Sequence, residues 1–432
     1  MDMDTTTLGD LELFGSAEGD TGLFGLIDRT FTSRGRTALR ARIERPSSEV
    51  ASIRRTQAAV RFFASHPRAV ALDEGEMEEV ARYLESNIQI SARSALASRA
   101  EYAWMSLRYR DLLGELREGL AAAVVLFGRV AHLSRTLGSL EAPGEVADLV
   151  TRLEATAQAV LDARDGATTL LEADRKVRHD LGAAVLQALD DLAELDALRA
   201  MAETTTALGW VFPELVESDA FELDADDVVH PSVEDAVGNP VLLTGGEPMV
   251  FLTGPNMAGK TTYLRSVALV VVLGQAGMGV PARRARFTPV DTVFTSLNPA
   301  DNLRAGLSYF LAEVMRVKAA AELLAEGKRA LVLFDEAFKG TNVRDALDAS
   351  AQVITGFARA RRSGFIFSSH LAELVDVLRP HRAIRFRCFD GDIVGGTPRY
   401  SYRLSEGVSE KRFGLLLLRQ ARVPELIARI PA

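Results

Sequence analysis

Apolar side chains recur at helical spacing through the first half of the chain. Positions three and four residues apart share one face of an α-helix, so this spacing predicts amphipathic helices that pack against one another. Two such runs are Leu112, Leu116, Leu120, Val124 and Phe127, and Leu181, Val185, Leu189, Leu192 and Leu195. Strand signals are few before residue 205. The region from 21 to 205 is therefore predicted to form three or more long helices packed side by side.

The pattern changes after Gly209, where short apolar segments alternate with helical ones. Residues 249–253, 330–334 and 364–368 have the composition of buried strands, and residues 262–273 and 311–324 that of helices. This alternation predicts a parallel sheet covered by helices. We therefore expect an α/β domain over residues 209–432, an all-α domain over 21–208 and a flexible acidic leader over 1–20, which contains no lysine or arginine.

Composition narrows the class of protein. The 432 residues are 47% hydrophobic and 25% charged, which are the proportions of a globular protein. A formal net charge of -9 excludes a protein that binds nucleic acid by its net positive charge, although a local basic groove is compatible with it. Cys388 is the only cysteine, which excludes an intramolecular disulfide and a four-cysteine zinc site.

Targeting signals are missing from the expected places. The N-terminal stretch has neither the basic start nor the apolar core of a signal peptide. The most apolar run, residues 267–273, is far too short to span a bilayer. We expect a cytoplasmic protein with no membrane partner.

The strongest motif is a glycine-rich loop directly after the predicted strand 249–253. Its residues are Gly254, Pro255, Asn256, Met257, Ala258, Gly259, Lys260 and Thr261, followed by Thr262, and they fit the pattern G-x-x-x-x-G-K-[ST] completely. Glycines let backbone N–H groups surround phosphates, and the N-terminus of the following helix adds favourable partial charge. We expect Lys260 to reach the β- and γ-phosphates of ATP and the Thr261 hydroxyl to bind Mg²⁺.

Two further elements favour nucleotide hydrolysis over passive binding. Asp335 and Glu336 end an apolar segment, where Asp335 is expected to hold the Mg²⁺ shell and Glu336 to polarise the attacking water. His370 follows another predicted strand, and a neutral imidazole there is placed to sense the γ-phosphate.

Taken together, these residues resemble the ATPase domain of the MutS family of DNA mismatch-repair proteins. The proline–asparagine–methionine within residues 253–265 is characteristic, and residues 291–295, 306–310 and 335–345 are similar to further segments of that domain. Residues 23–32 resemble the start of the family's lever or core domain. The resemblance covers about residues 20 to 430 and implies an ABC-like P-loop NTPase of α/β fold, preceded by an all-α lever and core domain.

The resemblance also implies partners. In the family, the segment around Ser308 reaches the nucleotide site of the opposite subunit. This implies a homodimer with composite ATP sites, in which Ser308 contacts the γ-phosphate in trans. DNA, as mismatched or branched duplex, is the implied ligand, with ATP hydrolysis coupled to lever movement. Ala258 departs from the usual glycine, and Phe338 and Lys339 replace a small and a basic residue.

The family's DNA-reading modules are not expected here. Only an acidic segment of twenty residues precedes the levers, and residues 90–200 are helical in pattern throughout, without a strand-rich insertion that could form a DNA clamp. We expect no helix-turn-helix tail after Ala432. We therefore expect the levers and the motor without the mismatch reader.

Two alternatives remain open. A nucleotide-switched protein-interaction module that does not bind DNA directly fits the acidic charge. DNA binding would need a local basic surface, for which the candidates are Arg34, Arg36, Arg40 and Arg42, or Arg283, Arg284 and Arg286. A transporter-type ABC ATPase shares the loop and the acid pair, but residues 305–308 do not form its leucine–serine–glycine–glycine signature.

Overall fold

The structure, a computed structural model, divides the chain into two compact units. It describes residues 1–15, 22–86, 95–297, 309–371, 373–394, 397–409, 411, 420–427 and 429–430. Unit 1 contains residues 1–26, 43–54 and 208–432, and unit 2 contains residues 27–42 and 55–207. The chain passes from unit 2 back to unit 1 between residues 207 and 208, next to the expected domain boundary after residue 208. Residues 22–26 and 43–54, however, belong to unit 1 and not to the helical unit.

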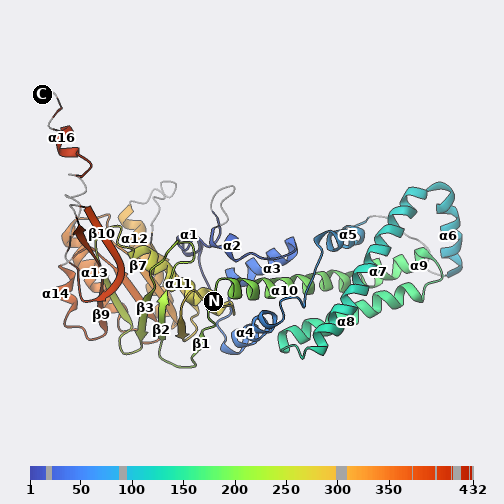
Figure 1. Cartoon of the computed structure of the whole chain (residues 1–432), viewed down its shortest axis with the longest axis horizontal. Coiled ribbons are helices and arrows are strands. Elements are labelled where there is room, and N and C mark those ends of the chain that lie inside the picture. Colours follow the sequence, from blue (N-terminus) through green and yellow to red (C-terminus); the bar gives the residue numbers. More distant parts are fainter. Residues whose placement is uncertain are drawn as a thin grey trace. The chain divides into compact units, whose positions relative to one another are not determined.

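Unit 2 is helical in its described parts (Figure 1). Its elements are most of α3 (Ser33–Glu44) and α4 (Val50–Ser65), then α5 (Glu74–Leu84), α6 (Ala95–Arg108), α7 (Arg110–Ser139), α8 (Gly144–Asp165), α9 (Leu170–Arg175), a π-helical turn (Lys176–Asp180) and α10 (Gly182–Ala207). The two apolar stripes of the sequence lie on α7 and α10, which confirms the prediction of long helices there. α7 packs against α8 and α5, and α10 packs against α8.

α7 is the central helix of unit 2. Among the described helices it alone is long and apolar enough to cross a membrane by length and composition. Its residues Leu116, Leu120 and Phe127 are buried in the unit, as in the core helix of a globular domain. Gly119 admits the ring of Tyr83 from α5, because a Cβ at this position would lie 2.3 Å from Cδ2 of that ring.

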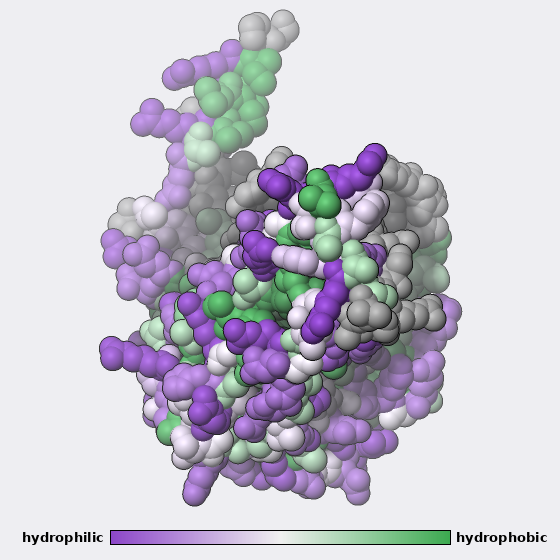
Figure 2. Space-filling model, turned by 90° about the vertical axis from the view of Figure 1, so that its right-hand side faces the viewer, coloured by the Kyte–Doolittle hydropathy of each residue, from purple (hydrophilic) through white to green (hydrophobic). Residues whose placement is uncertain are grey.

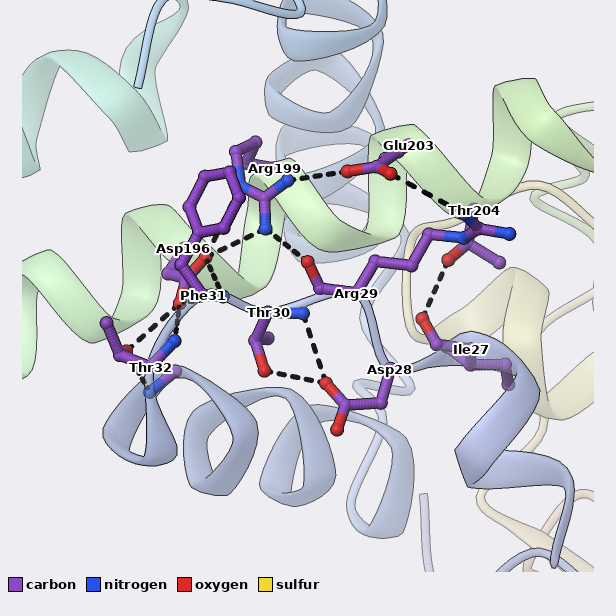
Figure 3. Close-up of polar contacts among 11 residues, drawn as sticks. Ile27, Asp28, Arg29, Thr30, Phe31, Thr32, Asp196, Arg199, Glu203 and Thr204 are labelled. Carbon is purple, nitrogen blue, oxygen red and sulfur yellow. Dashed lines mark hydrogen bonds and ion pairs between the residues drawn. The ribbon is translucent and has the colours of Figure 1, made fainter. Parts of the chain in front are cut away.

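A buried carboxylate fastens the segment before α3 to α10 (Figure 3). Oδ2 of Asp196 accepts hydrogen bonds from the backbone N–H groups of Phe31 and Thr32, both at 2.9 Å, and from the Thr32 hydroxyl at 3.0 Å. Arg199 pairs with Asp196 at 3.0 Å and places its guanidinium 3.6 Å from the centroid of the Phe31 ring. Each buried charge therefore has partners that offset its desolvation.

One end of unit 2 exposes apolar side chains on α6 and at the start of α7. Trp104 is 56% exposed and Leu107 is 82% exposed, and the ring of Tyr109 lies 5.1 Å from that of Trp104. Figure 2 looks onto this end and shows apolar residues, in green, among polar ones around a hollow. Clustered exposed aromatic residues are typical of a surface that contacts another molecule.

Unit 1 contains two sheets. The larger has the strand order β10-β9-β4-β8-β7-β6, in which all neighbours are parallel except β9 and β10. Its strands are β4 (Met249–Thr253), β6 (Thr292–Ser296), β7 (Ala330–Asp335), β8 (Gly364–Ser368), β9 (Ile384–Val394) and β10 (Thr397–Glu406). The smaller has the order β1-β5-β2-β3 and consists of β1 (Glu214–Leu215), β2 (Glu222–Val228), β3 (Asn239–Thr244) and β5 (Arg284–Phe287). The three strands predicted from the sequence are adjacent, as β4, β8 and β7.

Helices cover the larger sheet, which gives unit 1 the predicted α/β class. The apolar side chains of α12 (Tyr309–Ala325), α13 (Val343–Phe357) and α14 (Leu374–Leu378) share one core with Phe251, Phe334 and Phe367 of the sheet. α11 (Lys260–Gln275) contacts both β7 and β2, so it lies between the two sheets. This position explains the apolar run 267–273, which is completely buried. The remaining helices of the unit are α1 (Thr5–Asp10), α2 (Gly22–Ile27) and α16 (Val423–Ile427).

The N-terminal segment is not a flexible leader, and the expectation was wrong for the described residues 1–15. Asp2 bridges in parallel to Thr292 of β6, and residues 5–10 form α1. Asp10 is buried and accepts hydrogen bonds from the Thr295 hydroxyl at 2.8 Å and from the N–H of Leu297 at 2.9 Å. Asp2 and Asp10, which the sequence suggested were exposed to solvent, therefore contact the strand at the edge of the sheet. Residues 16–20 lie outside the described part.

Candidate nucleotide site

The glycine-rich loop joins the end of β4 to the start of α11. Gly254 approaches Phe389 so closely that a Cβ would lie 2.7 Å from the Phe389 carbonyl oxygen. Gly259 has φ of +97°, which glycine adopts without strain, and Met257 has φ of +69°. Ala258 is not among the described left-handed residues, so glycine is not required there. The turns enclose space at the N-terminus of α11, where backbone N–H groups attract anions.

Lys260 begins α11 and its side chain is only 6% exposed. Its Nζ donates to the carbonyl oxygens of Gly254, at 2.8 Å, and Pro255, at 3.2 Å, and lies 3.8 Å from Oε1 of Glu336. Burial lowers the pKa of Lys260, and the nearby carboxylates of Glu336 and Asp335 oppose this shift. The ammonium group is thus held inside the curve of the loop.

Asp335 ends β7 beside the first turn of α11. Its Oδ2 accepts a hydrogen bond from the Thr261 hydroxyl. Its Oδ1 is buried and has no hydrogen-bond partner among the described residues. Mg²⁺ prefers oxygen ligands and usually takes one or two from the protein, with water and phosphate completing its shell. The residues present therefore fit Mg²⁺ bound together with a nucleotide.

Glu336 follows Asp335 with φ of +54°, a left-handed conformation typical of strained functional positions. Its Oε2 lies 2.9 Å from Nζ of Lys339 and 3.5 Å from Nδ1 of His370 at the end of β8. The hydrogen bond with His370 and the pairing with Lys339 lower the pKa of Glu336 to about 2, against the opposing effect of burial. Glu336 is therefore an ionised acceptor at neutral pH.

These side chains border one cavity of about 720 Å³, whose walls include Asn256, Met257, Gly259, Lys260, Thr261, Thr262, Asp335, Glu336 and Lys339. A cavity of this size suits a ligand as large as a nucleotide. The structure thus brings together the loop, the acid pair and, through Glu336, His370.

Sequence reasoning missed a further wall of the cavity. Tyr402, His230 and Val237 line the cavity there. Asn239 positions Tyr402, because its side-chain amide donates to the Tyr402 carbonyl at 2.9 Å and accepts from the N–H of Leu404 at 2.7 Å. Tyr400 and Tyr402 are both aromatic, so the sequence does not single out position 402, and the contact of its ring with Gly259 depends on the fold of β10 beside β3.

Comparison with known proteins assigns both halves of the chain. A family model described as MutS domain III matches residues 6–208, and one described as MutS domain V matches residues 250–430. The chain belongs to the MutS family. It is 34% identical over 302 residues to the DNA mismatch repair protein MutS of Paracoccus denitrificans (strain Pd 1222), which covers 65% of this chain and 32% of the relative. It is 32% identical over 312 residues to the protein of the same name from Cereibacter sphaeroides (strain ATCC 17029 / ATH 2.4.9), which covers 68% of this chain and 34% of the relative.

This MutS-family chain thus spans about a third of the length of the curated relatives it matches. The matches confirm the resemblance drawn from the sequence. Ser308, expected to act in trans, lies outside the described residues, as do residues 298–307.

Carboxylates neutralise most of the arginines considered for DNA binding. Six of the seven candidates form ion pairs, all within 3.5 Å: Arg34 with Asp190, Arg36 with Asp28, Arg42 with Glu145 and Glu194, Arg283 with Asp227, Arg284 with Asp224 and Asp226, and Arg286 with Glu214 and Glu222. Phosphate contacts there would have to displace these partners. Neither cluster is a free basic surface.

Proposed function

We propose that this MutS-family chain is a Mg²⁺-dependent ATPase whose nucleotide state controls its grip on DNA, in mismatch repair or recombination. The observation that carries the proposal is the convergence of Lys260, Thr261, Asp335 and Glu336 on one cavity. The cavity lies in the part of the chain that resembles the family's ATPase domain, and the relatives named above are mismatch repair proteins.

The proposed chemistry follows from the charges around the cavity. Lys260 and the loop backbone bind the β- and γ-phosphates, and Thr261 and Asp335 hold Mg²⁺, which neutralises charge on the phosphate oxygens. Glu336 accepts a hydrogen bond from the attacking water. A carboxylate with a pKa of about 2 is a weak base, so its role is to orient and polarise the water rather than to remove a proton early. His370 lies beside Glu336, and its proposed role is to sense the γ-phosphate.

The proposed assembly is a homodimer with two composite ATP sites. Ser308 of each chain contacts the γ-phosphate bound by its partner, as the resemblance implies. ATP binding then moves the helical levers by favouring one of two arrangements of the dimer. Replacing Ser308 with alanine is expected to slow turnover while ATP binding remains.

The surface that best supports DNA contact is the exposed end of unit 2. Arg99 and Arg108 form no ion pair among the described residues there, and they belong to α6, the helix that carries the exposed Trp104. Cations beside exposed aromatic rings suit phosphates and unstacked bases. The alternative, a nucleotide-switched module that binds a protein instead of DNA, fits the net charge of -9 but not the named function of the relatives.

The deciding experiment measures ATPase activity without DNA and with perfect, mismatched and branched duplexes. Stimulation by one of these identifies the DNA substrate, and equal rates in all four favour the protein-binding alternative. Lys260→Ala should abolish nucleotide binding, whereas Lys328→Ala, which alters an exposed lysine pairing with Glu326, should not. DNA binding carried by phosphate contacts should also weaken steeply with salt.

A further inference from the structure

α12 holds the segment that carries Glu336 through a buried carboxylate. Glu313 is 2% exposed, and its two oxygens accept hydrogen bonds from the backbone N–H groups of Lys339 and Gly340, each at 3.1 Å. The ring of Phe310, three residues earlier on the helix, lies 6.2 Å from the buried ring of Phe338. One polar and one apolar contact thus fix residues 338–340 to the helix.

The segment held in this way has a strained backbone. Glu336 and Phe338 adopt φ of +54° and +66°, left-handed conformations that are unfavourable for residues with a side chain. Strained conformations persist only where surrounding contacts impose them. Without Glu313, the N–H groups of Lys339 and Gly340 would lose the partner that opposes relaxation.

α12 is itself anchored one turn beyond Glu313. Arg316 donates to the Thr295 carbonyl of β6 at 2.9 Å and lies 3.7 Å above the ring of Phe294. The helix begins at Tyr309, the residue after Ser308 in the sequence. A single helix therefore links the residue expected to reach the partner subunit with the segment that carries Glu336.

We propose that Glu313 is a positioning residue for ATP hydrolysis, which holds residues 336–340 in the conformation that presents Glu336 to the cavity. Turnover then depends on the placement of α12. Glu313 is not among the residues that line the cavity in the described part of the chain, so it acts through the backbone and not on the nucleotide. The inference rests on the ATPase activity proposed above.

The test compares steady-state kinetics and nucleotide affinity of the full chain carrying Glu313→Gln or Glu313→Ala. Glutamine preserves the size of the side chain but can accept only one of the two hydrogen bonds. We expect kcat to fall about tenfold in Glu313→Gln and on the order of 10²-fold in Glu313→Ala, because small misplacements of a reacting group have effects of this size. KM and the Kd of a fluorescent ATP analogue should stay within about twofold, because the groups that bind phosphate are unchanged.

Glu322→Gln is the matched control, since Glu322 lies on the same helix with an exposed side chain paired to Lys318. It should leave kcat unchanged. A wild-type kcat in Glu313→Gln, or a loss of affinity as large as the loss of kcat, would overturn the positioning role. Phe310→Leu tests the same link if Glu313→Gln does not fold, and it too must lower kcat selectively. A wild-type protein without ATPase activity would instead reject the proposed function.

Discussion

Thr261 donates a hydrogen bond to Oδ2 of Asp335 across 74 residues of sequence. The contact joins the first turn of α11 to the end of β7, so the two segments predicted to share a metal ion already meet. Oδ1 of Asp335 points away from this bond, is buried and has no partner among the described residues. An unsatisfied buried acceptor costs about 1–3 kcal/mol, which a bound cation would offset.

Asp335→Asn should therefore weaken the Mg²⁺-dependent part of nucleotide binding. We expect the affinity for a fluorescent ATP analogue to fall at least about tenfold with Mg²⁺, and little with EDTA, because a neutral amide is a poor Mg²⁺ ligand. Titrations in both buffers measure this difference. Asp376→Asn, at an exposed position on α14, is the control. Equal losses with and without Mg²⁺ would show that Asp335 acts only as a hydrogen-bond acceptor for Thr261.

Glu336→Gln should separate binding from hydrolysis. The amide keeps the size of the side chain but polarises water weakly, so ATP should bind with nearly unchanged affinity while turnover falls by about 10²-fold or more. Equilibrium binding and single-turnover phosphate release measure the two effects. Turnover at the wild-type rate would remove Glu336 from the reaction.

The same carboxylate should affect stability in acid. Its pKa of about 2 in the folded protein lies below the ordinary value of 4.5. Ionised Glu336 thus stabilises the folded state above about pH 4.5, and this contribution is lost as the pH falls towards 2. Lowering the pH from about 6 to about 3 should therefore reduce the thermal stability of the wild type more than that of Glu336→Gln, as measured by thermal unfolding at each pH. Parallel changes in the two proteins would contradict the lowered pKa.

Tyr402→Ala should weaken nucleotide binding by removing an aromatic wall of the cavity. Tyr402 is 47% exposed, lines the cavity and is held through its backbone by Asn239. Stacking of a base on an aromatic ring contributes about 1–3 kcal/mol, so affinity should fall about 10- to 100-fold. Tyr402→Phe retains the ring and should bind normally. Binding that is equally weak in both variants would point to the hydroxyl instead of stacking.

The sequence predicted those elements whose signal is local. β4 and β8 have the predicted bounds because each is a run of five buried residues with an apolar centre, four apolar residues before Thr253 in β4 and three between Gly364 and Ser368 in β8. The loop with Lys260 was recognised because its chemistry is contained in eight consecutive residues. α7 and α10 were predicted from apolar spacing alone, since one buried face per helix is enough to set the pattern.

What the sequence did not predict depends on contacts between distant residues. Asp10 reads as solvated until Thr295 and Leu297 are placed beside it. The roles of Glu313 and Tyr402 could not be predicted, because their partners lie 26 and 163 residues away in Lys339 and Asn239. The arginine clusters were predicted as candidate phosphate contacts because they look unpaired in the sequence. Their carboxylate partners belong to other segments of the chain, which the fold brings beside them. Pairing of charges is a tertiary property that a linear pattern does not contain.

Asp196→Ala should destabilise unit 2 severely. The substitution leaves the N–H groups of Phe31 and Thr32 without their acceptor and removes one of the two carboxylates that pair with the buried guanidinium of Arg199, the other being Glu203. Removing one partner of a buried ion pair costs about 3–5 kcal/mol. Urea unfolding followed by helical circular dichroism should show an early transition for unit 2, while nucleotide binding by unit 1 gives a separate readout. Asp190→Ala is the matched control on the same helix, because Asp190 is 60% exposed and pairs with Arg34 at the surface. Its cost should stay below about 1 kcal/mol, and equal costs at the two positions would refute the role of burial.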